Sequence, residues 1–189
     1  MLFSWTKDKG IETQDQLPPI TEVGANTAGF LINGKVIVPK NGNQIVGSSP
    51  SYGLTIGAGG NFHPPIIGDD YFFVKIVDFK SNPSIVLWIQ VNNLLAGVGT
   101  YNLGAATGNF FSYSPANPFI LYEICTDINN CKVYYSELNS GTIVFSRFDY
   151  YGGIYSGTFK GILTNRNNSA DKVQITDGRF DIKIATLNN

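Results

Sequence analysis

Charged residues are scarce in this chain of 189 residues: Lys, Arg, Asp and Glu make up 14% of it, against about 25% in an average soluble protein. The 13 basic and 14 acidic residues leave a net charge of -1. Such a balance supplies no positive field that would attract phosphates or anionic lipid, so we expect no nucleic-acid partner. No apolar run approaches the roughly 18 residues of a membrane-spanning helix, so we also expect no transmembrane segment.

Histidine and cysteine are scarcer still, and this limits the common catalytic and metal-binding arrangements. His63 is the single histidine, and no Gly-x-Ser-x-Gly turn accompanies it, whereas a Ser-His-acid set needs the base beside a nucleophile. Two cysteines alone cannot complete a tetrahedral zinc site. The segment 57–60 is rich in glycine but lacks the Lys-Ser/Thr ending of a phosphate-binding loop. We therefore expect that the protein is not an enzyme and that it binds no metal and no cofactor.

Paired carboxylates are the enzymatic option that the composition excludes least, because glycoside hydrolysis needs only two acids flanking a sugar. Glu123, Asp127 and Glu137 lie near the cysteines in the sequence. Asp69-Asp70 forms a second acidic spot, which could alternatively bind calcium. Because 14 acids produce such neighbours by chance, solvated surface acids are the favoured interpretation. A carboxylate-dependent glycan hydrolase stays a minor alternative.

Glycine (21 residues) and aromatic residues (13%) are abundant, and together with nine prolines they favour turns and strands over helices. No stretch of about twelve residues carries a helical apolar stripe. Alternating apolar runs bounded by turn residues predict strands, besides those of the hairpins at both ends, near 52–57, 70–79, 84–92, 98–103, 118–125, 131–137, 141–149 and 153–163. About ten short strands predict an all-β domain, either an antiparallel β-sandwich or a barrel-like fold built from hairpins.

Two dipeptides ending in glycine predict hairpins. Asn33-Gly34 and Asp177-Gly178 each lie between alternating apolar runs, and both suit a type I′ loop, whose two central residues need positive φ. In the second hairpin Ile175 would face Phe180, which places apolar pairs on one side of the hairpin and polar pairs on the other. A third hairpin is expected around Tyr150-Tyr151-Gly152.

Cys125 and Cys131 flank a polar segment of turn-forming residues between two apolar runs, so they could face each other across a hairpin. A disulfide there would close a small loop and contribute about 2 kcal/mol to stability. It would also favour an oxidising compartment. The alternative is a pair of free, half-buried thiols.

The domain organisation is simple. Residues 1–24 show no apolar period and contain Pro18-Pro19, so they predict a flexible N-terminal tether. Met1–Trp5 is too short for the apolar region of a signal peptide, which takes about 7 to 15 residues. Residues 25–186 are expected to form a single β domain, followed by a C-terminal tail at 187–189.

Two parts of the sequence are similar to a known family: LPPITEVGANTAGFLINGKV at 17–36, and YSGTF at 155–159 with DGRFD at 177–181. With these motifs the chain resembles an uncharacterised family of exported Bacteroidota lipoproteins. The resemblance implies a periplasmic or cell-surface location, and no activity, because the family has none assigned. Its members carry a lipidated cysteine before a short charged tether. Trp5 stands at that position here, so either an upstream signal was lost and the lipidation site altered, or the protein is an unanchored variant.

The remaining candidates for function are aromatic residues in or near expected loops: Tyr113, Tyr135, Tyr150 and Tyr151. Fixed rings on a sheet scaffold could stack on sugars or anchor a protein. Alternatively, paired aromatics on strands cover the core and neighbouring side chains without a ligand. We expect a noncatalytic binding or structural module of the cell envelope, with a glycan or protein partner. A barrel that carries a small apolar ligand is the alternative, suggested by the two-faced apolar hairpin at 29–38 and by Trp88.

Overall fold

The computed structural model describes residues 15–43, 49–59, 71–92, 97–108, 117–127 and 130–189. Over these residues the strands form one 10-stranded antiparallel sheet: β1 (Thr27–Ile32), β2 (Lys35–Ile37), β3 (Leu54–Ala58), β4 (Tyr71–Asp78), β5 (Ser84–Asn92), β6 (Gly99–Asn102), β7 (Phe119–Asp127), β8 (Asn130–Asp149), β9 (Ile154–Asn165) and β10 (Asn168–Lys183). Their order is β2-β1-β10-β9-β8-β7-β5-β4-β3, and β6 pairs with β8. The predicted all-β fold is therefore confirmed.

Helix is confined, within the described ranges, to the 3-10 turn η1 (Ile184–Thr186). No helix in those ranges has the length and apolar character to span a bilayer.

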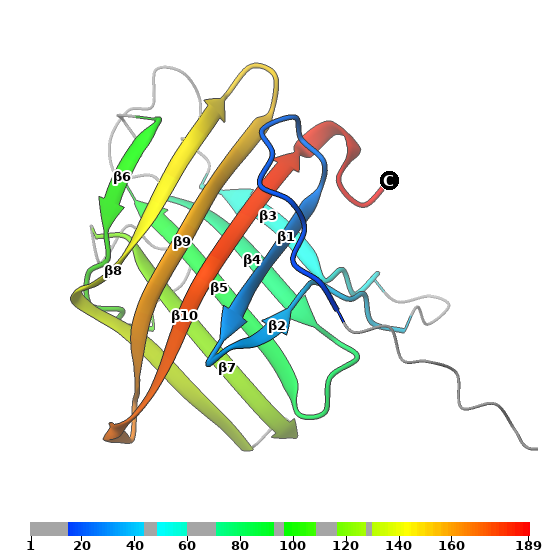
Figure 1. The fold of residues 1–189 in the computed structure, drawn as a ribbon. Helices are drawn as coiled ribbons and strands as arrows, with labels where there is room; N and C mark the ends of the chain where they lie inside the picture. The colour runs from blue at the N-terminus through cyan, green and yellow to red at the C-terminus, as the bar shows by residue number, and fades with distance from the viewer. Residues whose placement is uncertain (1–14, 44–48, 60–70, 93–96, 109–116, 128–129) are drawn as a thin grey trace, which may run out of the picture.

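The sheet curls on itself into a half-barrel (Figure 1). Strands β1, β10, β9 and β8 make one wall, and β3, β4, β5 and β7 make the wall opposite. The long β8 pairs with β7 through its first part and with β6 through its last part. The ring centre of Phe72 on β4 lies 5.6 Å from that of Phe145 on β8 and 5.1 Å from that of Tyr155 on β9. The two walls therefore pack face to face.

One apolar core occupies the space between the walls. Alternate residues of each strand point into it, as Val74 and Ile76 do on β4 and Leu87 and Ile89 do on β5. These four side chains are at most 1% exposed. Full burial of one such side chain contributes about 1.5–3 kcal/mol. The core is therefore the main source of stability and holds the two walls at a fixed separation.

The hairpin predicted at Asn33-Gly34 is confirmed. Asn33 has a φ of 48° and Gly34 a φ of 83°, as a type I′ turn requires at both positions. Ile32 pairs with Lys35 directly across the turn, so β1 and β2 are in the expected register.

The hairpin predicted at Asp177-Gly178 is wrong, because β10 continues through these residues. Ile175 and Gly178 both pair with the same neighbouring strand, β9, and the register shifts between them. Asp177, with a φ of 51°, lies in the resulting bulge. Beyond the bulge, the inward positions change from odd numbers, ending at Ile175, to even numbers, starting at Phe180. A hairpin would produce the same change of phase, so the sequence pattern fits both.

The two strands predicted between residues 131 and 149 are a single strand, β8. The register with β9 shifts between Ser136 and Gly141, and the extra residues loop out of the sheet. Asn139, with a φ of 59°, stands in this looped segment. Its N–H donates a hydrogen bond to the carbonyl of Leu103, and the Leu103 N–H donates to Gly141. The loop after β6 is thereby fixed against β8.

The N-terminal segment differs from the expected tether. Residues 15–24 lie against the sheet, because the buried Asp181 on β10 accepts hydrogen bonds from the segment. Arg179 and Arg147 add hydrogen bonds to the carbonyls of Pro18 and Glu22. Residues 1–14, including Trp5, lie outside the described residues, so the tether stays a prediction there.

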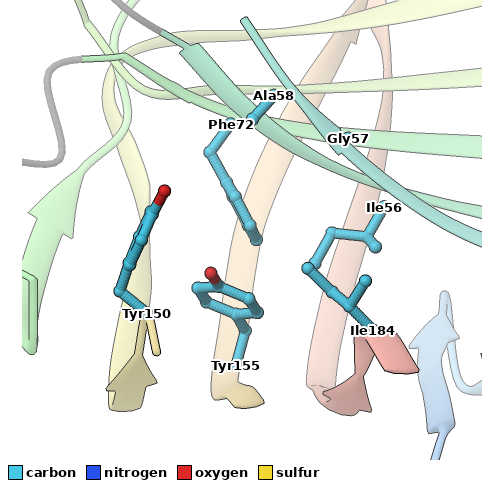
Figure 2. A pocket seen from close by; sticks show the side chains of 7 residues that line it. All are labelled: Ile56, Gly57, Ala58, Phe72, Tyr150, Tyr155 and Ile184. Atoms are coloured by element: carbon cyan, nitrogen blue, oxygen red, sulfur yellow. The ribbon is translucent and has the colours of Figure 1, made fainter. Parts of the chain in front are cut away.

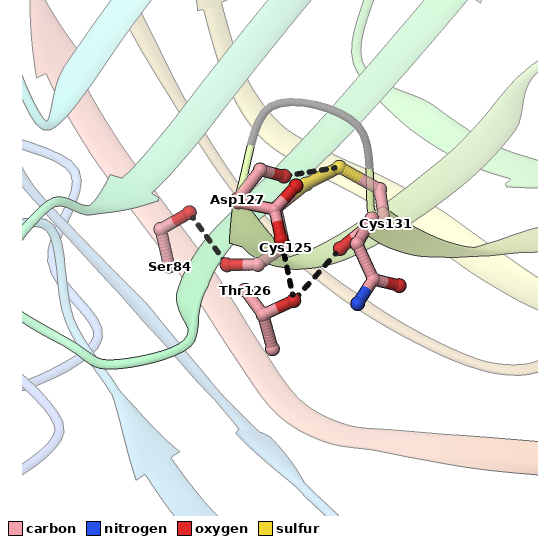
Figure 3. The surroundings of a disulfide bond; sticks show 6 residues. Ser84, Cys125, Thr126, Asp127 and Cys131 are labelled. Atoms are coloured by element: carbon pink, nitrogen blue, oxygen red, sulfur yellow. Dashed lines mark hydrogen bonds between the residues drawn. A yellow bond between two sulfur atoms is a disulfide. The ribbon is translucent and has the colours of Figure 1, made fainter.

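Cys125 and Cys131 form a disulfide between β7 and β8 (Figure 3), as the sequence predicts. The two residues are directly paired across the strands, with Cα atoms 4.1 Å apart. The hydroxyl of Ser84 on β5 donates to the carbonyl of Cys125 at 3.3 Å, and that of Thr126 donates to Asn130. The bridge therefore secures the end of this part of the sheet.

Candidate ligand-binding pocket

An apolar pocket of about 280 Å³ opens where the two walls separate at one end of the half-barrel (Figure 2). One side is formed by β3 and β4, and the other by the β8–β9 turn, the start of β9 and η1. The residues that line it are Ile56, Gly57, Ala58, Phe72, Tyr150, Tyr155 and Ile184.

The β3 side of the pocket follows from strand alternation. Ile56 and Ala58 point inward because they pair with Val74 and Phe72, which belong to the core. Gly57 lies between them. A side chain at this position would point to the other face of the sheet, where the Phe73 ring lies. A Cβ on Gly57 would lie 2.6 Å from a carbon of that ring. The glycine therefore lets the edge strand β3 pack closely on β4.

Tyr155 forms the floor of the pocket. It is 2% exposed, and its ring contacts Phe72 from the opposite wall and Phe148 at a ring-centre distance of 5.0 Å. Burial raises the pKa of Tyr155 to about 12, and the charges of Tyr150 and Asp149 add to this shift. The phenol of Tyr155 therefore stays neutral at physiological pH, where it can both donate and accept a hydrogen bond.

Tyr150 and Tyr151 are neighbours in the β8–β9 turn with different surroundings. Their ring centres lie 5.5 Å apart in an edge-to-face arrangement. Tyr150 lines the pocket, and Figure 2 shows the oxygen of Tyr155 on the side that faces Tyr150. Tyr151 is 88% exposed and does not line it. Of the two predicted tyrosines in this turn, only Tyr150 therefore belongs to the pocket.

Of the other two predicted tyrosines, Tyr135 is not part of this pocket. Tyr135 lies in the first part of β8, where it pairs with Thr164 near the far end of β9. It lines a separate groove beside Arg166. Tyr113 lies outside the described residues. The three predicted tyrosines that the structure describes therefore do not share one site.

The three candidate acids on β7 and β8 point to separate places. Glu123 pairs with Val133, Asp127 lies four residues further toward the β7–β8 turn, and Glu137 lies four residues from Val133 in the opposite direction. Four residues of strand span about 13 Å, beyond the roughly 5–10 Å between two glycosidase carboxyl groups. Asp69-Asp70 and His63 lie outside the described residues.

Glu123 has a structural partner on the outer face of the sheet. Burial raises the pKa of Glu123, and the positive charge of Lys75 partly opposes this shift. The Lys75 ammonium lies 4.5 Å from the centre of the Trp88 ring, and burial lowers the pKa of Lys75. In the described part of the chain, no group of three or more His, Cys, Asp or Glu could hold a metal ion.

The sequence reasoning missed Tyr155, Ile56 and Ile184. Tyr155 carried one signal, since it lies on the same face of the predicted strand 153–163 as the buried Phe159, four residues later. Ile56 and Ile184 carried none, because only the curl of the sheet brings β3 next to the end of β10.

Comparisons of the chain with protein-family models, curated proteins and solved structures find no match. The fold and the pocket define the class of protein as a curled antiparallel β-domain with an apolar pocket at its open end.

Proposed function

We propose that this chain is an exported, noncatalytic β-domain that binds a small, largely apolar group in the pocket between Tyr150, Tyr155 and Ile56. The observation that carries the proposal is the pocket: a preformed apolar opening between two packed walls, with tyrosine side chains on one side. Ligand sites in proteins are typically concave, mostly apolar and equipped with a few polar groups that orient the ligand.

The dimensions of the pocket select the ligand. Its volume of about 280 Å³ lies just below the roughly 300–1,000 Å³ range of ligand sites. It therefore suits one or two fused rings or a short aliphatic chain. Phe72 and Tyr155 offer aromatic surface, and the phenols offer a partner for a single polar group of the ligand.

The core argues against a larger apolar cargo. The space between the walls is filled by the clustered side chains of the core, including Phe72, Phe145 and Phe180. Ring-centre distances of 5.6 Å for Phe72 with Phe145 and 5.4 Å for Phe145 with Phe180 leave these rings in contact. The space for an apolar ligand is therefore limited to the pocket at the end of the half-barrel.

The chemistry of the lining supports binding without catalysis. Apart from its two tyrosines, the described lining consists of aliphatic residues, a glycine and a phenylalanine, with no carboxylate, imidazole, thiol or amine. A nucleophile needs an adjacent base, and a general base needs a pKa near the working pH. Tyr155, with a pKa of about 12, does not meet this condition.

Export is supported by the disulfide. A Cys125–Cys131 bridge is characteristic of oxidising compartments such as the periplasm or the cell surface. The pocket would then meet its ligand in the envelope or outside the cell.

Isothermal titration calorimetry with indole tests the proposal. Indole is a flat apolar molecule whose single N–H can donate a hydrogen bond to a tyrosine oxygen. We expect saturable binding, weakened about tenfold or more by Ala58→Phe, which fills the pocket from β3. Ile184→Trp is a second filling variant at a side chain that is 50% exposed. Tyr151→Phe, outside the pocket, should bind as the unchanged chain does. Absence of saturable binding, or binding unaffected by both filling variants, would refute the proposed site.

A further inference from the structure

A second concave site lies at the opposite end of the β8–β9 hairpin from the pocket. This polar groove, of about 490 Å³, is formed by Tyr135–Glu137, by Thr164–Ser169 and by Ala105 and Ala106. Tyr155 and Thr164 are separated by nine residues of β9, or about 30 Å of extended strand. The polar groove is therefore independent of the pocket proposed above.

Extra residues in two strands create the polar groove. The register of β8 with β9 shifts after Ser136, and that of β9 with β10 shifts after Asn168, so both strand pairs open at this end. Ala106 donates its N–H to the carbonyl of Ser136, and Glu137 donates its N–H to the Ser140 hydroxyl. These bonds fix one side of the groove, while the β9–β10 turn forms the other.

The lining of the polar groove includes an aromatic ring with a guanidinium beside it. Tyr135 points away from the core, since its neighbour Tyr134 belongs to the core. The Arg166 guanidinium lies 5.8 Å from the centre of the Tyr135 ring and donates a hydrogen bond to its hydroxyl at 3.3 Å. The N–H of Arg166 is bonded to the carbonyl of Val133, which fixes the start of the turn. The Tyr135 ring and the Arg166 guanidinium are therefore held together, and a backbone hydrogen bond fixes the residue that carries the guanidinium.

Several polar side chains around this ring have hydrogen-bonding capacity left. Among the described residues, the Glu137 carboxylate, the Asn167 amide and the Ser169 hydroxyl have no hydrogen-bond partner. Asn165 differs, because its amide donates to Asp171 and its oxygen accepts from the Asn167 N–H. The groove therefore has a structural residue, Asn165, and free donors and acceptors beside it.

We propose that the polar groove binds a neutral sugar residue of an oligosaccharide. A sugar ring has an apolar C–H face, which packs on an aromatic ring such as Tyr135, and hydroxyls that use donors and acceptors together. The guanidinium of Arg166 and the amide of Asn167 donate, and the carboxylate of Glu137 accepts. The charges of Arg166 and Glu137 are opposite and cancel. The groove therefore favours a neutral ligand over an anion, because Glu137 would repel an anion. An apolar ligand would leave all these polar groups without partners.

A glycan array with neutral oligosaccharides of hexoses and N-acetylhexosamines, together with uronic-acid oligosaccharides, tests the proposal. We expect binding to neutral members, confirmed by calorimetry with the best of them. Asn167→Ala and Tyr135→Ala should each weaken that binding about tenfold or more. Asn167 is exposed, so its variant keeps the test valid if Tyr135→Ala does not fold. Tyr151→Phe is the matched control, and indole binding should be the same in all of these variants.

Three outcomes would overturn the sugar site: no binding to any array member, binding to uronic-acid members alone, or binding that survives Asn167→Ala and Tyr135→Ala. Capture of a peptide by the same groove, with no response to glycans, would also overturn it and would point to a protein partner. Loss of indole binding with intact glycan binding would refute the pocket and leave the polar groove standing, so the two proposals fail separately.

Discussion

The carboxylate of Asp181 accepts a hydrogen bond of 2.6 Å from the hydroxyl of Thr21, a residue 160 positions earlier in the chain. The same buried carboxylate accepts hydrogen bonds from the Ser156 hydroxyl and from the N–H groups of Gly24 and Ala25. Burial opposes its charge, but the bonds from Thr21, Ser156 and the two backbone groups outweigh burial and hold the pKa of Asp181 below its usual value. Through these hydrogen bonds, Asp181 on β10 holds the N-terminal segment against β9 and β10.

Asp181→Asn should therefore destabilise the fold by about 3 kcal/mol, because an amide nitrogen would face N–H and O–H donors. Urea unfolding at neutral pH measures the difference. Asp177→Asn is the matched control: it removes a carboxylate from the same strand, at an exposed residue whose positive φ suits asparagine. Equal stability of the two variants would contradict the role of Asp181.

The contribution of Asp181 should depend on pH in one direction. A carboxylate whose pKa is lower in the folded state stabilises the fold above its unfolded pKa of about 3.9, and this is lost as pH falls through the folded pKa. The gap between the wild-type chain and Asp181→Asn should be constant near neutrality and shrink below about pH 4. A gap that widens on acidification would contradict this sign.

Gly157 on β9 lies where no side chain fits. A Cβ there would overlap the carbonyl oxygen of Val144 and come within 2.9 Å of the Phe180 ring. Gly157→Ala should cost about 2–4 kcal/mol, because backbone on one side and a packed core ring on the other must move. At Gly161, on the same strand, the nearest atom is the end of the flexible Leu103 side chain at 3.0 Å. In thermal unfolding, the midpoint temperature of Gly157→Ala should lie well below that of Gly161→Ala. The reverse order would contradict this account of the packing around Gly157.

The Cys125–Cys131 disulfide, with a sequence separation of 6, should contribute about 2 kcal/mol by closing a short loop in the unfolded chain. Reduction with dithiothreitol should lower the urea midpoint of the wild-type chain and leave the Cys125→Ser/Cys131→Ser double variant unchanged. Thiol titration of the protein isolated from its native cells, with thiol oxidation blocked during isolation, should find no reactive cysteine. Two free thiols would contradict the bridge and would remove its support for export.

Binding of indole should not depend on pH across the neutral range. Because the pKa of Tyr155 is raised to about 12, this phenol keeps its proton between about pH 6 and about pH 9. Calorimetric titrations at these two values should give the same affinity. A loss of affinity at the higher value in the Tyr150→Phe variant, in which Tyr155 is the one ionisable side chain of the described lining, would contradict the neutral phenol.

Local features of the fold could be predicted from the sequence because neighbouring residues determine them. Asn33-Gly34 produces its turn through backbone preference alone, and Cys125 and Cys131 meet across a short hairpin. Asp177-Gly178 shows the limit of this reasoning. The same positive φ serves a turn or a bulge, and only pairing with β9 decides that β10 continues.

The pocket could be predicted only in part. Tyr150 was a candidate because aromatic residues in turns are available to ligands, and this property is visible in the sequence. Ile56 and Ile184 meet it only because the sheet curls, which depends on the twist and packing of all the strands. Residues 15–24 were expected to be free because they lack an apolar period, but Asp181 holds part of this segment by hydrogen bonds, which that pattern does not reveal.

The most direct test of the proposed binding function is methyl NMR of the chain labelled at Ile and Ala during titration with indole. The pocket predicts saturable shifts at the methyl groups of Ile56, Ala58 and Ile184, which line it, and none at Ile32 or Ala28, which lie in the core on β1. Shifts spread evenly over all these methyl groups, or no shifts at any of them, would contradict a binding pocket between the walls.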